Sequence, residues 1–231
     1  MDAEKRNSIH LINLFSELGD GQINEISEKC TWKRYSSGTE VLGQAEASTD
    51  IFFVVEGRVL AKKFSAEGKE VAYTEMAKGD LFGEFSAIDL KPRSASIETL
   101  EESYIARMKA SEFRKLIIAY PTLGLKLSEH LVEKNRYLTG RIFEFSTMAV
   151  NHRICAELLR LVDAGSSKTN EYTILPAPSH YQIATKLSTH REAVSRELSY
   201  LSSLGILEAG RQKIKILDIS RLRKMTEVEI Q

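Results

Sequence analysis

Residues 82–95 read FGEFSAIDLKPRSA, and this stretch decides how the first half of the chain is interpreted. Gly83 tolerates backbone dihedrals that other residues avoid, and it lets the chain approach a ligand closely. Successive backbone amides next to such a glycine form a concave site for an anion. Arg93 carries a planar guanidinium that pairs bidentately with phosphate oxygens, and Ser94 adds a hydroxyl donor beside it. The stretch therefore suits a compact phosphate.

Glu84 supplies the group that a sugar next to this phosphate needs. An ionised carboxylate only accepts hydrogen bonds, and a ribose hydroxyl donates one. Phosphate and sugar recognition within one short segment predicts a cyclic nucleotide as the ligand. The alternative interpretation is a surface turn of a β-rich domain, in which Glu84 and Arg93 simply face solvent.

The sequence around this stretch predicts a β-rich domain. Between Trp32 and Met108, short apolar and β-prone runs alternate with turn signals such as Glu56-Gly57 and Lys78-Gly79-Asp80. Strands are expected within residues 51–64, 71–76, 94–100 and 103–108. Many short strands at close spacing predict a barrel or jelly roll, with the FGEFSAIDLKPRSA stretch in a loop between two strands.

Helices are predicted after Met108. Ser111 is a plausible N-cap of one helix, and Pro121 fits the first turn of a longer one that continues past residue 145. Within the longer helix, steps of four and three residues define an a/d seam. The seam consists of Leu131, Asn135, Leu138, Ile142, Phe145 and Ala149. It predicts a dimer through this helix, the alternative being that the seam packs against the protein's own barrel.

The C-terminal part predicts a winged helix-turn-helix. A helix over 151–164 is followed by a polar loop, and two short amphipathic helices then lie on either side of Leu187-Ser188-Thr189. Their apolar faces comprise Ile183, Ala184 and Leu187 in the first helix and Val194, Leu198, Leu201 and Leu204 in the second. A hairpin over 206–217, with its tip at 210–213, completes the wing.

Several polar residues of this region are candidates for contacts with DNA. Arg191, Glu192 and Arg196 lie away from the apolar stripe of the second helix and suit guanine and cytosine edges in a major groove. Ser179 and Thr189 each open a helix, where capping and phosphate contact combine. The alternative is a helical hairpin with charged outer faces and no role in DNA binding, and Ser188 stands where glycine is frequent in such turns.

Composition narrows the class of protein. The 231 residues are 42% hydrophobic and 28% charged, which is ordinary for a globular protein of two modest domains. The formal net charge is zero, yet residues 177–224 hold nine Lys or Arg against four Asp or Glu, so this segment alone suits a polyanion. No run of 18 apolar residues occurs and no apolar signal core follows the N-terminus. We therefore expect neither secretion nor a membrane partner, and a cytoplasmic location.

Metal sites and catalysis have little support. Cys30 and Cys155 lack metal-ligand spacing and are expected to be buried apolar fillers. The five histidines form no zinc motif, and no nucleophile–base pair is evident. The sequence predicts a protein that is not an enzyme and holds no metal.

Two motifs carry a resemblance to a known family. Residues 82–95 resemble the phosphate-binding cassette of cyclic-nucleotide-binding domains, in which F-G-E is followed by a short apolar run and R-[S/T/A]-A. The string T-x-R-E-x-V-S-R at 189–196 resembles the recognition helix of the Crp/Fnr family of bacterial transcription regulators. The resemblance covers about residues 10–217. It implies an α+β chain with a β-roll nucleotide domain at 1–120, a dimerisation helix at 121–149 and a winged helix-turn-helix at 150–231.

The resemblance also implies site residues. Gly83, Glu84 and Phe85 would meet the ribose-phosphate, Arg93 and Ser94 the phosphate, and Leu138 and Thr139 the purine edge. Leu138 replaces a hydroxyl residue, which removes a hydrogen bond worth on the order of 1 kcal/mol to adenine. Thr74 and Ser94 suit guanine as well, so both cyclic AMP and cyclic GMP are candidate ligands. For DNA, the implied contacts are Ser179, Thr189, His190, Arg191, Glu192, Arg196 and Lys213.

The implied function is a transcription regulator, either an activator or a repressor, that depends on a cyclic nucleotide and binds palindromic, TGTGA-like DNA as a homodimer. RNA polymerase is a candidate partner, with the 165–173 loop as its contact surface. Two other functions stay open. One is a regulator of the same fold that needs no ligand, and the other is a nucleotide-gated module that binds protein and not DNA.

Overall fold

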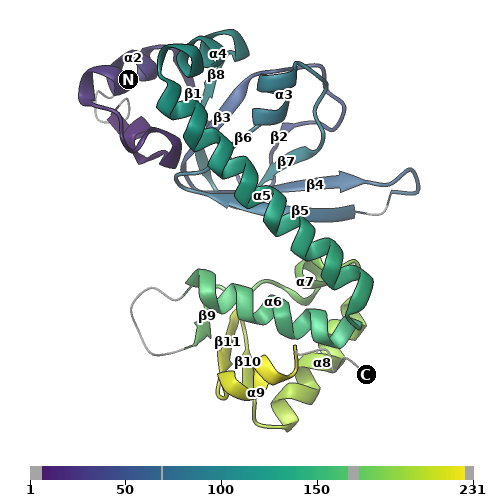
Figure 1. Cartoon of the computed structure of the whole chain (residues 1–231). Coiled ribbons are helices and arrows are strands. Elements are labelled where there is room, and N and C mark those ends of the chain that lie inside the picture. The colour runs from purple at the N-terminus through teal and green to yellow at the C-terminus, as the bar shows by residue number, and fades with distance from the viewer. Residues whose placement is uncertain (1–6, 69, 166–171, 227–231) are drawn as a thin grey trace. The chain divides into compact units, whose positions relative to one another are not determined.

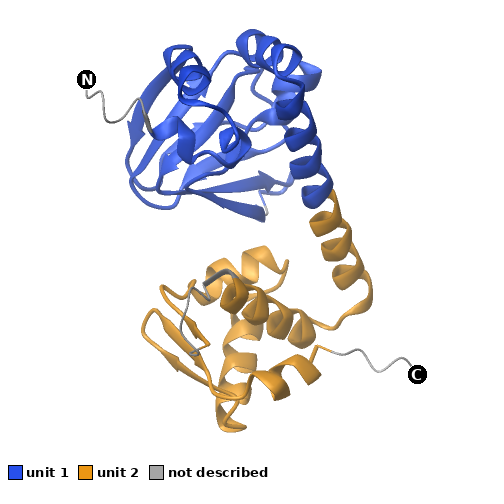
Figure 2. Ribbon diagram, turned by 60° about the vertical axis from the view of Figure 1, so that its left-hand side comes forward, with its two compact units in different colours: residues 1–134 blue, residues 135–231 orange. Residues whose placement is uncertain are grey.

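The computed structural model describes residues 7–68, 70–165 and 172–226. The chain divides into two compact units, residues 1–134 and 135–231, and the boundary lies within one long helix (Figure 2). Each unit contains its own hydrophobic cluster. Among the described residues, no helix combines the length and the apolar character that crossing a membrane requires. The predicted α+β class is confirmed, since the first unit contains two antiparallel sheets together with helices and the second is mainly helical (Figure 1).

The first unit contains two antiparallel sheets of four strands each. One sheet has the order β1-β8-β3-β6 and the other the order β2-β7-β4-β5. The strands are β1 (Cys30–Tyr35), β2 (Glu40–Leu42), β3 (Ile51–Glu56), β4 (Arg58–Phe64), β5 (Glu70–Ala77), β6 (Leu81–Phe82), β7 (Ser96–Thr99) and β8 (Ser103–Met108). The predicted strands at 51–64, 71–76, 94–100 and 103–108 are all present within a residue or two of their expected ends.

Strand β3 explains why both sheets share one interior. Its residues 51–55 are all buried, which fits a run of five apolar residues without polar alternation. Phe53 and Val55 belong to the cluster that the helices cover, whereas Phe52 and Val54 belong to the cluster between the sheets. The rings of Phe52 and Phe82 stack with their centroids 5.0 Å apart. This contact fixes strand β6, and therefore the residues that follow it.

Helices cover one side of the first unit. They are the short 3-10 helices η1 (Asn7–Leu11) and η2 (Asn13–Phe15) and the α-helices α2 (Asp20–Glu28) and α4 (Ala110–Ala119). The prediction that Ser111 caps a helix is wrong, because α4 already begins at Ala110. Strand β8 ends at Met108, so Lys109 takes the extended N-cap position, and its carbonyl accepts from the amide of Phe113.

The long helix α5 (Pro121–Thr147) begins at the proline that the sequence predicts. Leu123 and Leu127 are buried in the first unit, and Leu131 packs against the same cluster. Leu131 is therefore corrected from the predicted dimer seam to the core of its own unit. Leu125, Val132 and Ile142 are exposed along the same helix.

The second unit is a winged helix-turn-helix. Its elements after α5 are α6 (Val150–Gly165), β9 (Thr173–Ile174), α7 (His180–Lys186), α8 (Arg191–Ser203), β10 (Leu207–Gly210), β11 (Lys213–Ile216) and α9 (Ile219–Lys224). The strands form a sheet in the order β10-β11-β9. The predicted apolar faces of α7 and α8 are buried except for Leu204, which is half-buried. Between α7 and α8, Ser188 has φ of +50°, the left-handed conformation that makes glycine frequent in such turns.

Candidate functional site

The second residue of the predicted cassette is a glycine that no other residue replaces easily. Strand β6 ends at Phe82, and Gly83 has φ of +82° as the N-cap of α3 (Glu84–Asp89). A Cβ atom at this position would lie 2.7 Å from Arg93 Nη1 and 2.9 Å from the carbonyl oxygen of Asp50. Gly83 therefore provides both the left-handed turn and the space in which the guanidinium of Arg93 lies.

Arg93 is buried and held by the protein through part of its donors. Its Nε donates to Ser48 Oγ at 3.0 Å, Nη1 to the Gly83 carbonyl at 3.2 Å and Nη2 to the Asp50 carbonyl at 2.7 Å. Its guanidinium carbon lies 5.6 Å from the centre of the Phe52 ring. A guanidinium has five N–H donors, so these three bonds leave two, one on each terminal nitrogen. The side chain is thus fixed in place and still has a pair of donors for an anion.

The charge of Arg93 is incompletely balanced. Burial lowers the pKa of Arg93, and the nearby carboxylates of Glu46 and Asp50 oppose this effect. Arginine stays protonated throughout the range in which proteins are folded. A bound anion would therefore add the compensation that a buried cation requires.

The buried carboxylate of Glu84 already has a cationic partner. Glu84 is only 2% exposed, in the first turn of α3, and its Oε1 lies 2.7 Å from Lys134 Nζ on α5. The same ammonium group lies 5.0 Å from the centre of the Phe85 ring. Glu84 Oε2 makes none of the hydrogen bonds found among the described residues, so it can accept one from a sugar hydroxyl.

Lys134 is a site residue that the sequence reasoning missed. The only signal available was its spacing, since it lies four residues before Leu138 on a predicted helix and so on the same face. Fifty positions separate it from Glu84, and nothing local in the sequence indicates that the two side chains meet.

The remaining predicted ligand residues are placed differently. Ser94 is exposed beside Arg93, so its hydroxyl is accessible to a phosphate. Thr74 lies half-buried on β5, and none of the hydrogen bonds of the described residues joins it to the cassette. Leu138 and Thr139 lie on α5 in the second unit. Contacts of Thr74, Leu138 and Thr139 with a ligand stay predictions.

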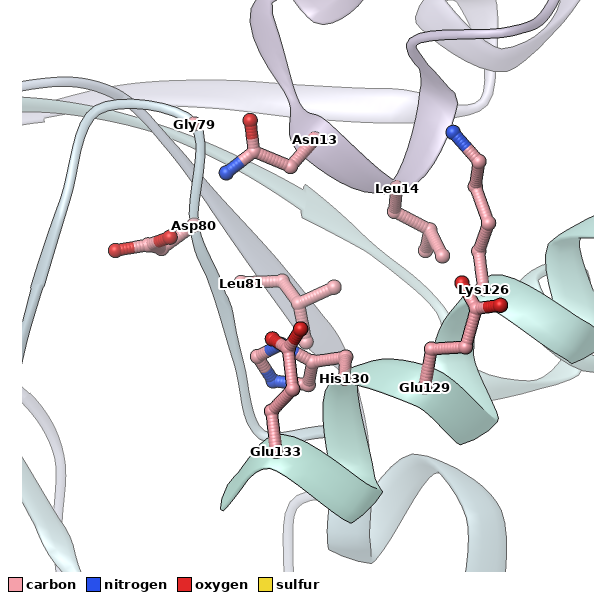
Figure 3. A pocket seen from close by; sticks show the side chains of 9 residues that line it. All are labelled: Asn13, Leu14, Gly79, Asp80, Leu81, Lys126, Glu129, His130 and Glu133. Atoms are coloured by element: carbon pink, nitrogen blue, oxygen red, sulfur yellow. The ribbon is translucent and has the colours of Figure 1, made fainter. Parts of the chain in front are cut away.

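A separate hollow in the first unit does not suit a phosphate. It has a volume of about 250 Å³ and lies between η2, the turn before β6 and one side of α5 (Figure 3). Asp80, Glu129 and Glu133 line it together with Lys126, whose ammonium group already lies 3.0 Å from Glu17. Three carboxylates against one paired lysine repel an anion. The cassette, and not this hollow, is the candidate nucleotide site.

In the second unit, the structure confirms one of the two predicted N-cap residues. Ser179 caps α7, because its hydroxyl accepts from the amide of Gln182 while the Gln182 side chain bonds back to the Ser179 amide. The prediction that Thr189 opens α8 is wrong by one residue, since His190 is the N-cap. Thr189 is half-buried instead, and its amide bonds to the carbonyl of Ala184.

The side chains predicted to reach DNA lie on the surface. They are Ser179, His190, Arg191, Glu192, Arg196 and Lys213. Three of these side chains, those of Arg191, Glu192 and Arg196, make no hydrogen bond or ion pair among the described residues. Their charged groups are therefore available to a partner. Contacts of these residues with DNA stay predictions.

A groove of about 710 Å³ adjoins these residues, between the start of α7, the start of α8 and the wing. It is lined by Ser179, Arg191 and Gln212 among others, and no Asp or Glu belongs to its lining. His180 also lines it and is held by a contact of 2.7 Å between its Nδ1 and Ser195 Oγ. A groove with a cation and no carboxylate is electrostatically suited to a polyanion.

Two protein families match separate parts of the chain. Residues 32–120 match the cyclic nucleotide-binding domain, and residues 152–225 match the Crp-like helix-turn-helix domain. The first match includes the whole cassette, and the second includes both short helices and the wing.

Curated relatives match over most of their length. The chain is 24% identical to the cyclic AMP receptor protein of Thermus thermophilus, over 92% of this chain and 95% of the relative. It is 23% identical to the cAMP-activated global transcriptional regulator CRP of Haemophilus influenzae, over 81% and 84% of the two chains.

Solved structures with similar folds include FixK2 from Bradyrhizobium japonicum, with a TM-score of 0.76 at 22% identity, covering 86% of this chain and 98% of that one. A CooA mutant from Carboxydothermus hydrogenoformans has a TM-score of 0.80 at 19% identity, covering 94% and 95%. At these identities the structural likeness establishes the fold alone.

Proposed function

The chain belongs to the Crp/Fnr family of transcription regulators, and on this basis we propose that it is a homodimer whose binding to DNA depends on cyclic AMP or cyclic GMP. The two relatives named above are a cyclic AMP receptor protein and a cAMP-activated transcriptional regulator, and neither is an enzyme. The identity of the nucleotide, the dimer and the palindromic target belong to the proposal.

One observation carries the nucleotide part of the proposal. Arg93 is anchored by three protein acceptors and keeps two N–H donors, and Glu84 keeps one carboxylate oxygen, within a single cassette. Two donors side by side suit two phosphate oxygens, and the carboxylate oxygen suits the 2′-hydroxyl of ribose. A cyclic nucleotide presents these groups together, whereas inorganic phosphate offers only the first.

The choice between adenine and guanine depends on few groups. Thr139 is an exposed hydroxyl residue on α5, and Leu138 beside it offers no hydrogen bond. Thr74 and Ser94 supply hydroxyls that donate or accept with either base. We therefore keep cyclic AMP and cyclic GMP as alternative ligands.

Exposed apolar residues on α5 support a dimer. Leu125, Val132 and Ile142 are 64%, 52% and 67% exposed. Leu125 and Val132 are seven residues apart and take a positions of one heptad series, and Ile142, ten residues after Val132, takes a d position. The same series also contains Asn135 at d and Thr139 at a. Burial of this face against a second copy removes apolar side chains from water.

Two copies would place two recognition helices on one DNA duplex. Arg191, Glu192 and Arg196 of α8 would read base edges in successive major grooves about 34 Å apart, which requires a palindromic site. Residues 165–173, which the sequence suggests as a surface for RNA polymerase in an activator, lie largely outside the described residues.

The test of nucleotide dependence is fluorescence anisotropy of a labelled TGTGA-type palindrome, at one fixed salt concentration because affinity for DNA depends on salt. DNA affinity is measured without nucleotide, with cyclic AMP and with cyclic GMP. We expect tighter binding with at least one nucleotide. S94A should weaken the response to nucleotide, whereas S111A, an equivalent change at another exposed serine, should leave it intact.

The other possible results select the alternatives. Equal DNA binding in all three conditions would favour a regulator of the same fold that needs no ligand. No DNA binding under any condition, after alternative half-sites and low salt had been tried, would favour the protein-binding module. R191Q and R223Q remove the same charge from exposed positions of the second unit, and only R191Q should abolish sequence preference.

The dimer has its own test in sedimentation equilibrium. I142E places a charge on the exposed face of α5 and should convert the dimer to monomer. I118E makes the same change at an isoleucine of α4 that is 80% exposed, and should leave the dimer intact. A monomeric wild type, or an unchanged I142E dimer, would refute the proposed interface.

A further inference from the structure

A buried charge cluster joins three helices of the second unit. Its centre is Glu157 on α6, which is only 1% exposed. Lys186 Nζ, at the end of α7, lies 2.7 Å from Glu157 Oε1, and Arg160 Nη2 of α6 lies 2.9 Å from Oε2. Arg141 Nη1 of α5 approaches Oε2 to 3.7 Å. A buried carboxylate needs such compensation, so these positions depend on one another.

Arg141 is the member that contacts all three helices. It is 7% exposed, and its Nη1 donates to Glu144 Oε2 on α5 at 2.9 Å while approaching Glu157 on α6. Its Nη2 donates to the backbone carbonyl of Lys186 at 2.9 Å, which satisfies an acceptor at the end of α7. The guanidinium also lies 4.9 Å from the centre of the Phe145 ring. A planar fork with several donors is suited to this bridging role, and a lysine is not.

Arg141 lies on α5 between the predicted purine contact and the helices that carry the predicted DNA contacts. Arg141 follows Thr139, the predicted contact to the purine, by two residues on the same continuous helix. Helix α7 in turn packs against the recognition helix α8, since Ile183, Leu187 and Val194 share one core. Any displacement or rotation of this part of α5 changes the hydrogen bond to Lys186 and the pairing with Glu157.

We propose that Arg141 is a positioning residue, through which the C-terminal part of α5 sets the orientation of α7 and thereby couples nucleotide binding to DNA affinity. The inference rests on the proposed nucleotide dependence. The inference adds to that proposal the side chain through which nucleotide binding would change DNA affinity. A change in α5 must alter a contact with α7 in order to shift the orientation of α7.

The experiment compares R141M with R136M in the full-length protein. Arg136 lies five residues earlier on α5 and is exposed, and its side chain has no hydrogen bond or ion pair among the described residues. For each variant, anisotropy gives the ratio of DNA affinities with and without saturating nucleotide, and calorimetry gives the nucleotide affinity without DNA. The coupling is reciprocal, so the nucleotide affinity on DNA provides a second, independent value of the same ratio.

R141M should bind nucleotide as the wild type does in the absence of DNA, while its coupling ratio falls at least tenfold. R136M should keep the wild-type ratio. A purely structural role of Arg141 would weaken DNA binding equally with and without nucleotide and leave the ratio unchanged, and that result would overturn the inference. If R141M does not fold, R141K retains the charge without the fork and should lower the ratio in the same direction; an unchanged ratio in R141K would likewise overturn it.

The wild type separates this inference from the proposed function. A wild-type ratio of one means that DNA binding does not depend on nucleotide, so the proposed function fails and the inference with it. A wild-type ratio well above one that R141M retains leaves the proposed function intact and refutes only the role of Arg141.

Discussion

Replacing Gly83 with alanine should disturb the first unit through two separate effects. The backbone has φ of +82°, and a left-handed residue with a Cβ costs about 1 to 2 kcal/mol. The new Cβ would also lie 2.7 Å from Arg93 Nη1 and 2.9 Å from the Asp50 carbonyl oxygen, and overpacking of this kind costs about 1 to 3 kcal/mol. We expect G83A to lower the free energy of unfolding of this unit by about 2 to 5 kcal/mol.

Gly38 provides the matched control, because it separates strain from crowding. Its φ is +74°, and a Cβ added there meets no atom within 4 Å. G38A should therefore cost about 1 to 2 kcal/mol, the conformational part alone. Urea unfolding followed by tryptophan fluorescence measures both variants, since the single tryptophan, Trp32, lies on β1 and stacks on Tyr104 in the first unit.

G83A should also weaken nucleotide binding, because the guanidinium of Arg93 must move away from the new methyl group. Losing one charge-assisted hydrogen bond costs about 1.5 to 3 kcal/mol, which is about ten- to hundredfold in affinity. Titration calorimetry with the better of the two nucleotides measures this, and G38A should bind as the wild type does. Equal stability of G83A and G38A, together with an unchanged affinity of G83A, would refute the argument that Gly83 makes space for Arg93.

Three further predictions concern buried groups. K134M leaves the buried carboxylate of Glu84 without its partner and should destabilise the protein by about 1 to 3 kcal/mol, with E84Q/K134M more stable than K134M alone in urea unfolding. Burial raises the pKa of Glu197 above its ordinary value of 4.5, so its charged form opposes folding. E197Q should therefore raise Tm at neutral pH, and the difference should vanish below pH 4.5, where the carboxyl is protonated in both states. Burial raises the pKa of Cys30 and Cys155 to about 12, so Ellman's reagent should modify neither thiol in the native protein and both in urea; modification of the native protein would contradict this.

Local signals explain which parts of the fold the sequence predicts well. The wing, the strands on either side of Glu56-Gly57 and the start of α5 at Pro121 each follow from residues that are close in sequence. The cassette depends on Gly83 and Arg93, which are only ten positions apart. The short strand β9 was not predicted, because two residues carry no period and their pairing with β11 depends on partners forty positions away.

Contacts between distant segments explain what the sequence does not reveal. Lys134 meets Glu84 across fifty residues, and Arg141 meets the carbonyl of Lys186 across forty-five. From sequence alone, a single lysine or arginine on a helix is interpreted as a charge that faces solvent, because its partner is not known. The error at Ser111 has a related cause, because the end of strand β8, and not the best capping residue, determines where α4 begins.

Helix α5 shows why one apolar pattern supports two conclusions. Its predicted seam combined Leu131 with Ile142, since steps of three and four residues fit both. An α-helix turns by about 100° per residue, so Ile142, eleven residues after Leu131, lies within about 20° of it around the helix axis. Leu131 packs against the core of the first unit, whereas Ile142 lies beyond the boundary at residue 134 and is 67% exposed. Leu125 and Val132 are also exposed, but they lie on a different side of the helix, about 100° from Leu131. Of the two seam residues, Ile142 is the one left for a second copy to bury, and this is why I142E rather than a change at Leu131 tests the dimer.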